Sequence, residues 1–251
     1  MRPSQASEAI VLRARAYGES DKIVTFLTCD AGKLTGIAKG AKNSRRRFAN
    51  CLDAFTRVRV HFRVRPGASL VFMESCDLLH PPGVLTEPVK FAYGSYLIEL
   101  VDLLTGEAHP VREIFELLTA GLDELERGPA TAALLRAFEL QLLIDTGYEP
   151  QLTVCSRCRQ PLAVSAQAYL DTMTGSLFCA ACRSTAQMVI AVAGETLAAL
   201  DAVKGQPLST IRDRRFARTI AAEATQLMGH LLAQYLPRPP RSLKLIAALG
   251  R

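Results

Sequence analysis

One segment with strict alternation limits the first third of this chain to a β structure. Residues 55–65 read FTRVRVHFRVR. From residue 57 onward, arginine or histidine occupies one parity, and valine or phenylalanine occupies the other. Successive residues of a strand face opposite sides, so the segment predicts a strand with one apolar face and one cationic face. Arginines on one strand face repel each other unless negative charge lies across them. The segment therefore indicates an anionic partner.

The distribution of charge along the chain supports the same interpretation. The first 80 residues hold fourteen Lys and Arg against seven Asp and Glu, a net charge of +7, while the remaining 171 residues carry −1. The two parts together give the net charge of +6 for the whole chain. Such an asymmetry is typical of a protein in which one region meets a polyanion.

Five short strands are expected in the basic region, at residues 8–15, 22–28, 33–39, 55–65 and 70–78. Turn-forming residues separate several of them, as in YGESD at 17–21 and RPGA at 65–68. Five short strands with a longer connection after the third are typical of the OB-fold, a small barrel that binds oligonucleotides. An SH3-like barrel or a half-open sheet would give a similar pattern.

The long connection after the third strand is itself basic. Residues 40–51 read GAKNSRRRFANC and carry Lys42, Arg45, Arg46 and Arg47, and two further lysines, Lys33 and Lys39, precede them. A run of charge is often only a solvated surface. Beside a strand with a cationic face, we expect this loop to follow the phosphates of a nucleic acid.

After Pro81 the pattern changes from strands to helices. Apolar residues recur at helical spacing in six segments: 88–104, 110–127, 129–146, 194–203, 209–235 and 243–249. The third is apolar on most sides and is expected at the centre of a helical bundle. The fold class is therefore α+β. We expect an N-terminal five-stranded OB-fold barrel at residues 1–80, and then a mostly helical domain at 81–251 with a zinc-binding module inserted at 153–187.

Four of the seven cysteines predict that inserted module. Cys155 and Cys158 form one C-x2-C pair, and Cys179 and Cys182 form another, with twenty residues between the pairs. Two such pairs complete a tetrahedral four-thiolate zinc site, and the spacer fits a hairpin that turns at Thr174 and Gly175. Because the tetrahedron leaves no open position, one structural zinc ion is expected. A redox pair and an iron–sulfur cluster are the alternatives. The remaining three cysteines are expected to be buried thiols.

The sequence contains no recognised catalytic motif. It has no G-x-x-x-x-G-K-[ST] phosphate loop, no H-E-x-x-H and no G-x-S-x-G, and its four histidines lie apart from one another. We therefore expect a binding protein and not an enzyme. No apolar run approaches the roughly 20 residues that span a bilayer, and the opening residues do not read as a secretion signal. A cytoplasmic protein is expected.

The order of these features resembles the RecO family of bacterial recombination mediators. The most specific stretch is EAIVLRARAYGESDKIVTFLTCDAGKLTGIAKGAKNS near the start, and the closing PRSLKLIAAL and the embedded cysteine pairs agree with it. The resemblance covers essentially the whole chain. It implies a protein that binds single- and double-stranded DNA and anneals complementary strands without ATP. With RecR, such a protein helps RecA load onto DNA coated by single-stranded DNA-binding protein. The resemblance also implies association with the nucleoid during repair.

The resemblance carries over Lys33, Lys39 and Lys42 as DNA contacts. Patterning adds the arginines of the loop and of the strand, with intramolecular salt bridges as the alternative for some of them: Arg45, Arg46, Arg47, Arg57, Arg59, Arg63 and Arg65. The resemblance also implies that the helical domain binds the C-terminal tail of single-stranded DNA-binding protein. A cluster of arginines at 212–218 could take a carboxylate of that tail or could be a solvated face.

Two other functions fit the same residues. An OB-fold does not by itself choose DNA over RNA, so an RNA-binding or translation-associated factor is one alternative. The other is a scaffold whose basic face meets an acidic protein.

Overall fold

The computed structural model describes residues 3–64, 67–107, 109, 112–183 and 188–249. By contacts the chain divides into two compact units. The first comprises Met1–Glu126 together with Arg241–Arg251, and the second comprises Arg127–Pro240. The expected boundary at residues 80 and 81, and the module at 153–187, stay predictions.

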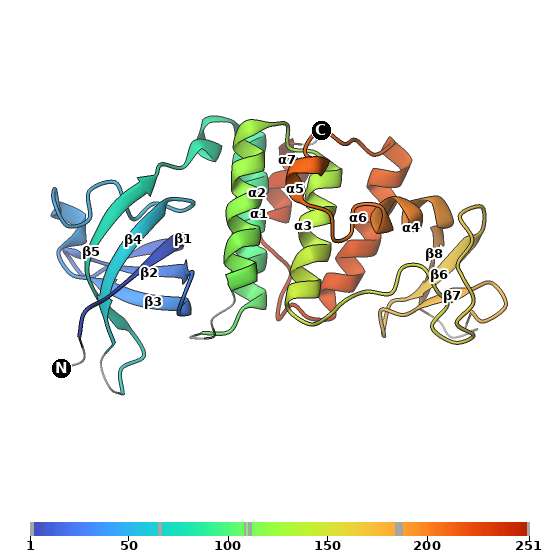
Figure 1. The fold of residues 1–251 in the computed structure, drawn as a ribbon, viewed down its shortest axis with the longest axis horizontal. Coiled ribbons are helices and arrows are strands. Elements are labelled where there is room, and N and C mark those ends of the chain that lie inside the picture. The colour runs from blue at the N-terminus through green and yellow to red at the C-terminus, as the bar shows by residue number, and fades with distance from the viewer. Residues whose placement is uncertain (1–2, 65–66, 108, 110–111, 184–187, 250–251) are drawn as a thin grey trace. The chain divides into compact units, whose positions relative to one another are not determined.

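Five strands form a closed barrel at the start of the first unit (Figure 1): β1 (Gln5–Tyr17), β2 (Asp21–Thr28), β3 (Gly32–Ala38), β4 (Arg57–Arg63) and β5 (Val71–His80). The order around the barrel is β1-β2-β3-β5-β4, and β4 pairs with β1 to close it. All neighbours are antiparallel except β3 and β5, which are parallel over three residue pairs. This topology confirms the expected five-stranded OB-fold barrel.

The interior of the barrel holds the apolar parity of the alternating segment. Val58, Val60 and Phe62 of β4 are each no more than 1% exposed, and Phe62 meets Phe26 of β2 edge to face, with ring centroids 6.3 Å apart. Aromatic pairs in this geometry add to the stability that burial alone provides. The predicted apolar face of this strand is confirmed.

Three helices complete the first unit: α1 (Pro88–Leu104), α2 (Arg112–Arg127) and α7 (Leu243–Leu249). A short 3-10 turn, η2 (Gly83–Thr86), leads into α1, which opens on a proline whose missing N–H is not needed there. The last helix returns to α1, where the backbone N–H and the hydroxyl of Ser242 both donate to Glu99 Oε2, at 2.9 and 2.8 Å.

The second unit is built around α3 (Ala132–Asp145). Thr131 caps this helix by accepting the Leu134 N–H at 3.1 Å. The helix contacts α4 (Gly194–Asp201), α5 (Leu208–Ile211) and α6 (Arg218–Ala233), and most of its residues are buried. A central position in the bundle was the expectation for this helix, and the structure confirms it.

The predicted helix at 209–235 is wrong in one respect, because it divides into α5 and α6. The break falls at residues 212–217, which read RDRRFA. Three arginines within four residues would crowd like charges on one helical turn, which disfavours continuing the helix. The cluster at 212–218 therefore lies across a helix break.

A three-stranded sheet precedes α4, in the order β7-β6-β8. Its strands are β6 (Gln167–Asp171), β7 (Leu177–Cys179) and β8 (Val189–Ala193). The hairpin between β6 and β7 turns where it was predicted, at Gly175, whose φ of 69° suits glycine. The third strand was not predicted, because VIAVA alone does not distinguish a strand from the start of the helix that follows.

Candidate nucleic-acid interface and metal centre

The cationic face of β4 is neutralised within the first unit. Each described basic side chain on this face lies against one acidic side chain: Arg57 and Asp123 at 3.1 Å, Arg59 and Glu8 at 3.1 Å, His61 and Asp77 at 2.9 Å, and Arg63 and Glu74 at 2.8 Å. Three of these acids come from the neighbouring strands β1 and β5, which flank β4 in the barrel. The negative charge that the arginines need is supplied, at least in part, by the chain itself. Arg65 lies outside the described residues.

Lys33 is also engaged within the first unit. Its side chain is 10% exposed, and its ammonium donates to the Asp102 carbonyl oxygen at 2.5 Å and to Asp102 Oδ1 at 3.2 Å. Arg13 Nε donates to the other carboxylate oxygen at 3.1 Å. Asp102 of α1 thus receives two cations from the barrel, and together they fix the helix to β1 and β3.

The five cations of the connection after β3 are in a different situation. Lys39, Lys42, Arg45, Arg46 and Arg47 are all exposed, and none forms an ion pair with a carboxylate in the described part of the chain. The contacts that do occur are to neutral groups. Lys42 Nζ donates to the Gly18 carbonyl at 2.7 Å, and Arg47 donates to the Lys39 carbonyl at 2.8 Å. We call these five side chains the loop cations.

The loop that carries them is anchored to the barrel. Gly40, with φ of 68°, donates its N–H to Asp21 Oδ1 at 2.8 Å. This bond, followed by the Ser20 hydroxyl and the charges of Lys39 and Lys42, lowers the pKa of Asp21 below its ordinary 3.8. Further along, the Cys76 N–H of β5 donates to the Arg47 carbonyl at 2.8 Å. Charged side chains are thus presented on a backbone held at both ends.

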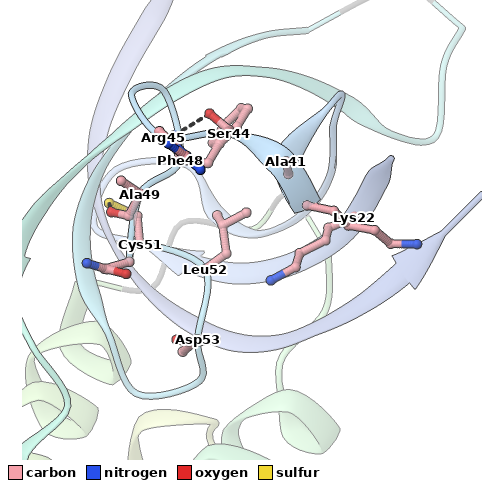
Figure 2. Close-up of a pocket in the computed structure, with 11 residues that line it drawn as sticks. Lys22, Ala41, Ser44, Arg45, Phe48, Ala49, Cys51, Leu52 and Asp53 are labelled. Atoms are coloured by element: carbon pink, nitrogen blue, oxygen red, sulfur yellow. Dashed lines mark hydrogen bonds between the residues drawn. The ribbon is translucent and has the colours of Figure 1, made fainter. Parts of the chain in front are cut away.

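A cavity of about 400 Å³ lies beside the loop cations. Lys22, Lys42 and Arg45 are among its lining residues. Figure 2 shows Lys22 and Arg45 on opposite sides, with Leu52 between them. Ser44 lines it as well, and its hydroxyl accepts the Phe48 N–H at 3.2 Å. The cavity is within the range of ligand sites, and its cations suit an anionic group such as a phosphate.

The second candidate site is the cysteine quartet of the second unit. The four sulfur atoms of Cys155, Cys158, Cys179 and Cys182 all lie within 4.8 Å of one another, and those of Cys158 and Cys179 are 3.8 Å apart. A tetrahedron with metal–sulfur distances of about 2.3 Å has edges of about 3.8 Å, so the sulfurs fit a zinc ion. Their tight spacing means that the quartet could hold a metal ion with every ligand supplied by the chain.

Backbone hydrogen bonds shape the two turns that carry the cysteines. Arg159 N–H donates to the Cys155 carbonyl, and Cys182 N–H donates to the Cys179 carbonyl, both at 3.0 Å. Burial by itself raises the pKa of Cys155, but hydrogen bonds from backbone N–H groups, led by that of Cys158, outweigh it and lower this pKa to about 6. A thiolate is therefore favoured at Cys155, and the thiolate is the form that binds metal.

Comparisons with known proteins identify the family of the chain. The family model described as recombination protein O N terminal matches residues 1–82, and that described as recombination protein O C terminal matches residues 85–244. The chain belongs to the recombination protein O family. The boundary between the two family models lies just after the barrel, since β5 ends at His80 and η2 begins at Gly83.

Curated relatives in the recombination protein O family match most of the chain. The DNA repair protein RecO of Anaeromyxobacter sp. (strain K) is 35% identical over 242 residues, which cover 96% of this chain and 95% of the relative. That of Syntrophus aciditrophicus is 34% identical over 255 residues, covering 100% and 98%. That of Pelobacter propionicus is 40% identical over 176 residues, covering 70% of each.

Sequence reasoning missed several features of this recombination protein O homologue. Lys22 lines the cavity although it was expected only as a strand residue. The acids of β5 that pair with β4 were not identified, because the positions of Glu74 and Asp77 within their own segment do not show which strand they face. Among the described residues, no helix has both the length and the apolar character needed to cross a bilayer.

Proposed function

We propose that this recombination protein O homologue binds single- and double-stranded DNA through the loop cations and anneals complementary strands without ATP. The observation that carries the proposal is the contrast between two sets of cations. Those of β4 are paired with acids, and the loop cations are not. The relatives named DNA repair protein RecO support DNA as the ligand.

The physical basis of the binding is the exchange of counterions. A phosphate chain carries condensed cations, and a protein cation that replaces one of them releases it to the solvent. An exposed ammonium or guanidinium can make this exchange without first breaking an internal ion pair. The loop cations therefore bind phosphates more readily than Lys33, Arg57, Arg59 or Arg63, whose role as DNA contacts stays a prediction, as does that of Arg65.

Annealing follows from the same surface. Two complementary strands repel each other through their phosphates, and a cationic surface that holds them lowers the repulsion and raises their local concentration. Base pairing then supplies the free energy, so no nucleotide needs to be hydrolysed. Contacts to phosphate carry no sequence information, so we expect little sequence preference. This role is that of a mediator and not of an enzyme.

Membership of the family supports a proposal for the setting of this activity. We propose that the protein acts in the cytoplasm, at the nucleoid during repair, with RecR and with single-stranded DNA-binding protein, whose C-terminal tail it binds, and that it helps RecA load. The quartet of cysteines is proposed to hold one structural zinc ion. Zinc would keep the β6–β8 region folded and would take no part in a reaction.

The test is the annealing of two complementary oligonucleotides coated with single-stranded DNA-binding protein, in the absence of ATP. The loop variant changes Lys39, Lys42, Arg45, Arg46 and Arg47 to Ala. Lys33 is left unchanged because its buried ammonium holds Asp102. Annealing by the wild type and its loss in the loop variant are expected.

A charge-neutral control tests whether an arginine that is paired with an acid contributes to annealing. The double variant Arg59→Gln with Glu8→Gln removes one ion pair of the barrel and leaves the net charge unchanged. It is expected to anneal like the wild type. No annealing by the folded, zinc-loaded wild type would contradict the proposal, and preferential annealing of RNA would favour the RNA-binding alternative.

A further inference from the structure

The sheet of the second unit has an outer face that carries two aromatic rings side by side. Tyr169 of β6 and Phe178 of β7 are direct cross-strand partners, so their side chains lie on the same face of the sheet. Their neighbours Ala168 and Leu170 point to the opposite face and are 2% and 0% exposed. The aromatic face is therefore the one turned away from the core.

Two arginines cover these rings. The guanidinium carbon of Arg157 lies 5.7 Å from the centre of the Phe178 ring, and that of Arg183 lies 5.0 Å from the centre of the Tyr169 ring. Both arginines belong to the turns that carry the metal-binding cysteines. The metal site and the aromatic face are thus built from the same two turns. The fold of the metal site therefore positions the backbone of both arginines.

This region has more basic than acidic side chains, as the loop after β3 does. Residues 151–193 contain three arginines and a single acid, Asp171, whose carboxylate accepts the Met173 N–H. In the described part of the chain, Arg157, Arg159 and Arg183 form no ion pair. A bound zinc with four thiolates would carry a formal charge of −2, which accounts for some of this excess but gives no reason for the two rings.

We propose that this face is a second binding surface for single-stranded nucleic acid, on which unpaired bases stack against Tyr169 and Phe178. Every base has a flat face that can stack on an aromatic ring, and a guanidinium can either continue the stack or turn to a phosphate. Bases inside a duplex are not accessible to such stacking, so the surface selects single strands. This inference takes one element from the proposed function, which is that the ligand is a nucleic acid.

The surface gives the annealing activity a second place to hold a strand. The loop cations bind phosphates and do not distinguish a duplex from a single strand. The aromatic face holds unpaired bases and releases them once they pair, because stacking within the duplex then competes with stacking on the rings. A strand on this face is kept open for pairing, and the duplex formed does not remain on it.

The test uses the full-length, zinc-loaded protein and the variant Tyr169→Leu with Phe178→Leu, which keeps apolar bulk and removes the aromatic faces. Affinity for a single-stranded oligonucleotide is expected to fall by on the order of tenfold or more, as loss of base stacking predicts. Affinity for the duplex of the same sequence is expected to change less than about twofold, because phosphate contacts are retained. An unchanged affinity for single strands would overturn the proposal.

A matched control comes from another aromatic pair of the same unit, Tyr148 and Tyr235, which is exposed, whereas Tyr169 and Phe178 are half-buried. Tyr148 and Tyr235 stack on each other with ring centres 4.0 Å apart, and the variant Tyr148→Leu with Tyr235→Leu removes the same number of rings. It is expected to bind both forms of DNA like the wild type. Equal losses in both aromatic variants would show a general effect on the unit and would overturn the assignment.

Two further measurements keep the result independent of folding and of the loop. Zinc content, measured for each variant, identifies any that has lost the metal site. Photocrosslinking with an iodouracil-substituted single strand is expected to label the peptides that contain Tyr169 or Phe178, and labelling confined to the first unit would contradict the proposal. Failure of the loop proposal looks different, since a loop variant that binds duplex normally would refute that proposal alone.

Discussion

The sharpest prediction concerns the salt dependence of DNA binding. The variant Arg45→Gln, Arg46→Gln and Arg47→Gln removes three of the five loop cations and leaves the contact of Gly40 with Asp21 in place. On single strands, each phosphate neutralised contributes about −0.7 to the slope of log affinity against log salt. Five contacts give a slope of about −3.5, and two give about −1.4.

The difference is large enough to measure directly. Between about 50 and about 200 mM salt, a slope of −3.5 lowers the affinity by on the order of a hundredfold, and a slope of −1.4 lowers it by on the order of sevenfold. Fluorescence anisotropy of a labelled oligonucleotide, titrated at four or more salt concentrations, gives both slopes. The affinity must be measured at several salt concentrations, because a single value does not separate the electrostatic contribution to binding from the other contributions.

The control removes one arginine of β4 together with its acidic partner. The variant Arg63→Gln with Glu74→Gln preserves the net charge and eliminates the ion pair of 2.8 Å. Its slope is expected to equal that of the wild type. A control slope reduced by one contact, or a loop variant with an unchanged slope, would refute the reasoning, because the paired arginines would then be the ones that meet phosphate.

Three other perturbations test the rest of the structure. Changing Cys155 and Cys179 to Ser is expected to abolish zinc binding and to unfold the β6–β8 region, since four-thiolate zinc sites contribute on the order of 10 kcal/mol to folding. Duplex binding by the barrel is expected to persist, and metal analysis with DNA titration measures both outcomes. The Asp21 pKa lies below 3.8, so the stability that its ionised form provides is complete above that value and is lost as the pH falls through the lowered pKa. The NMR shift of the Gly40 amide should therefore titrate with a midpoint below 3.8, and a midpoint at or above it would contradict the contact. Gly32→Ala places a Cβ 2.0 Å from the His109 carbonyl oxygen, whereas Gly67→Ala, also at positive φ, meets nothing within 4 Å; denaturant unfolding should show a loss of about 1 kcal/mol for Gly67→Ala and several for Gly32→Ala.

The parts of the fold that the sequence predicted best have signals that are local. Alternation at period two placed β4 and its buried face, because burial of one strand face depends only on which residues share a parity. The proline at the start of α1 and the apolar spacing behind it placed that helix at Pro88–Leu104. The cysteine quartet needed only its spacing, since each C-x2-C forms one turn by itself.

The parts that could not be predicted depend on strand register and tertiary contacts. The cationic face of β4 pointed to an external anion, but Glu8 and Glu74 reach it from β1 and β5, and pairing register is not visible in the segment itself. Lys33 looked equivalent to Lys39, yet only Lys33 meets Asp102, which lies 69 residues further along the chain. The arginines at 212–215 mark the break between α5 and α6 in the sequence. The prediction missed it because it followed only the spacing of the apolar residues.

The return of the chain to its first unit has a consequence for synthesis on the ribosome. Because Arg241–Arg251 belongs to the unit that begins at Met1, that unit lacks helix α7 until residues 243–249 have been synthesised. Glu99 cannot accept its hydrogen bonds from Ser242 until that residue, 143 positions later in the chain, has been synthesised. The second unit, whose residues are contiguous, can fold while the first is still unfinished. A message truncated just after the codon for Pro240 would therefore yield a protein with an intact second unit and an incomplete first one, in which α1 lacks its contact with α7.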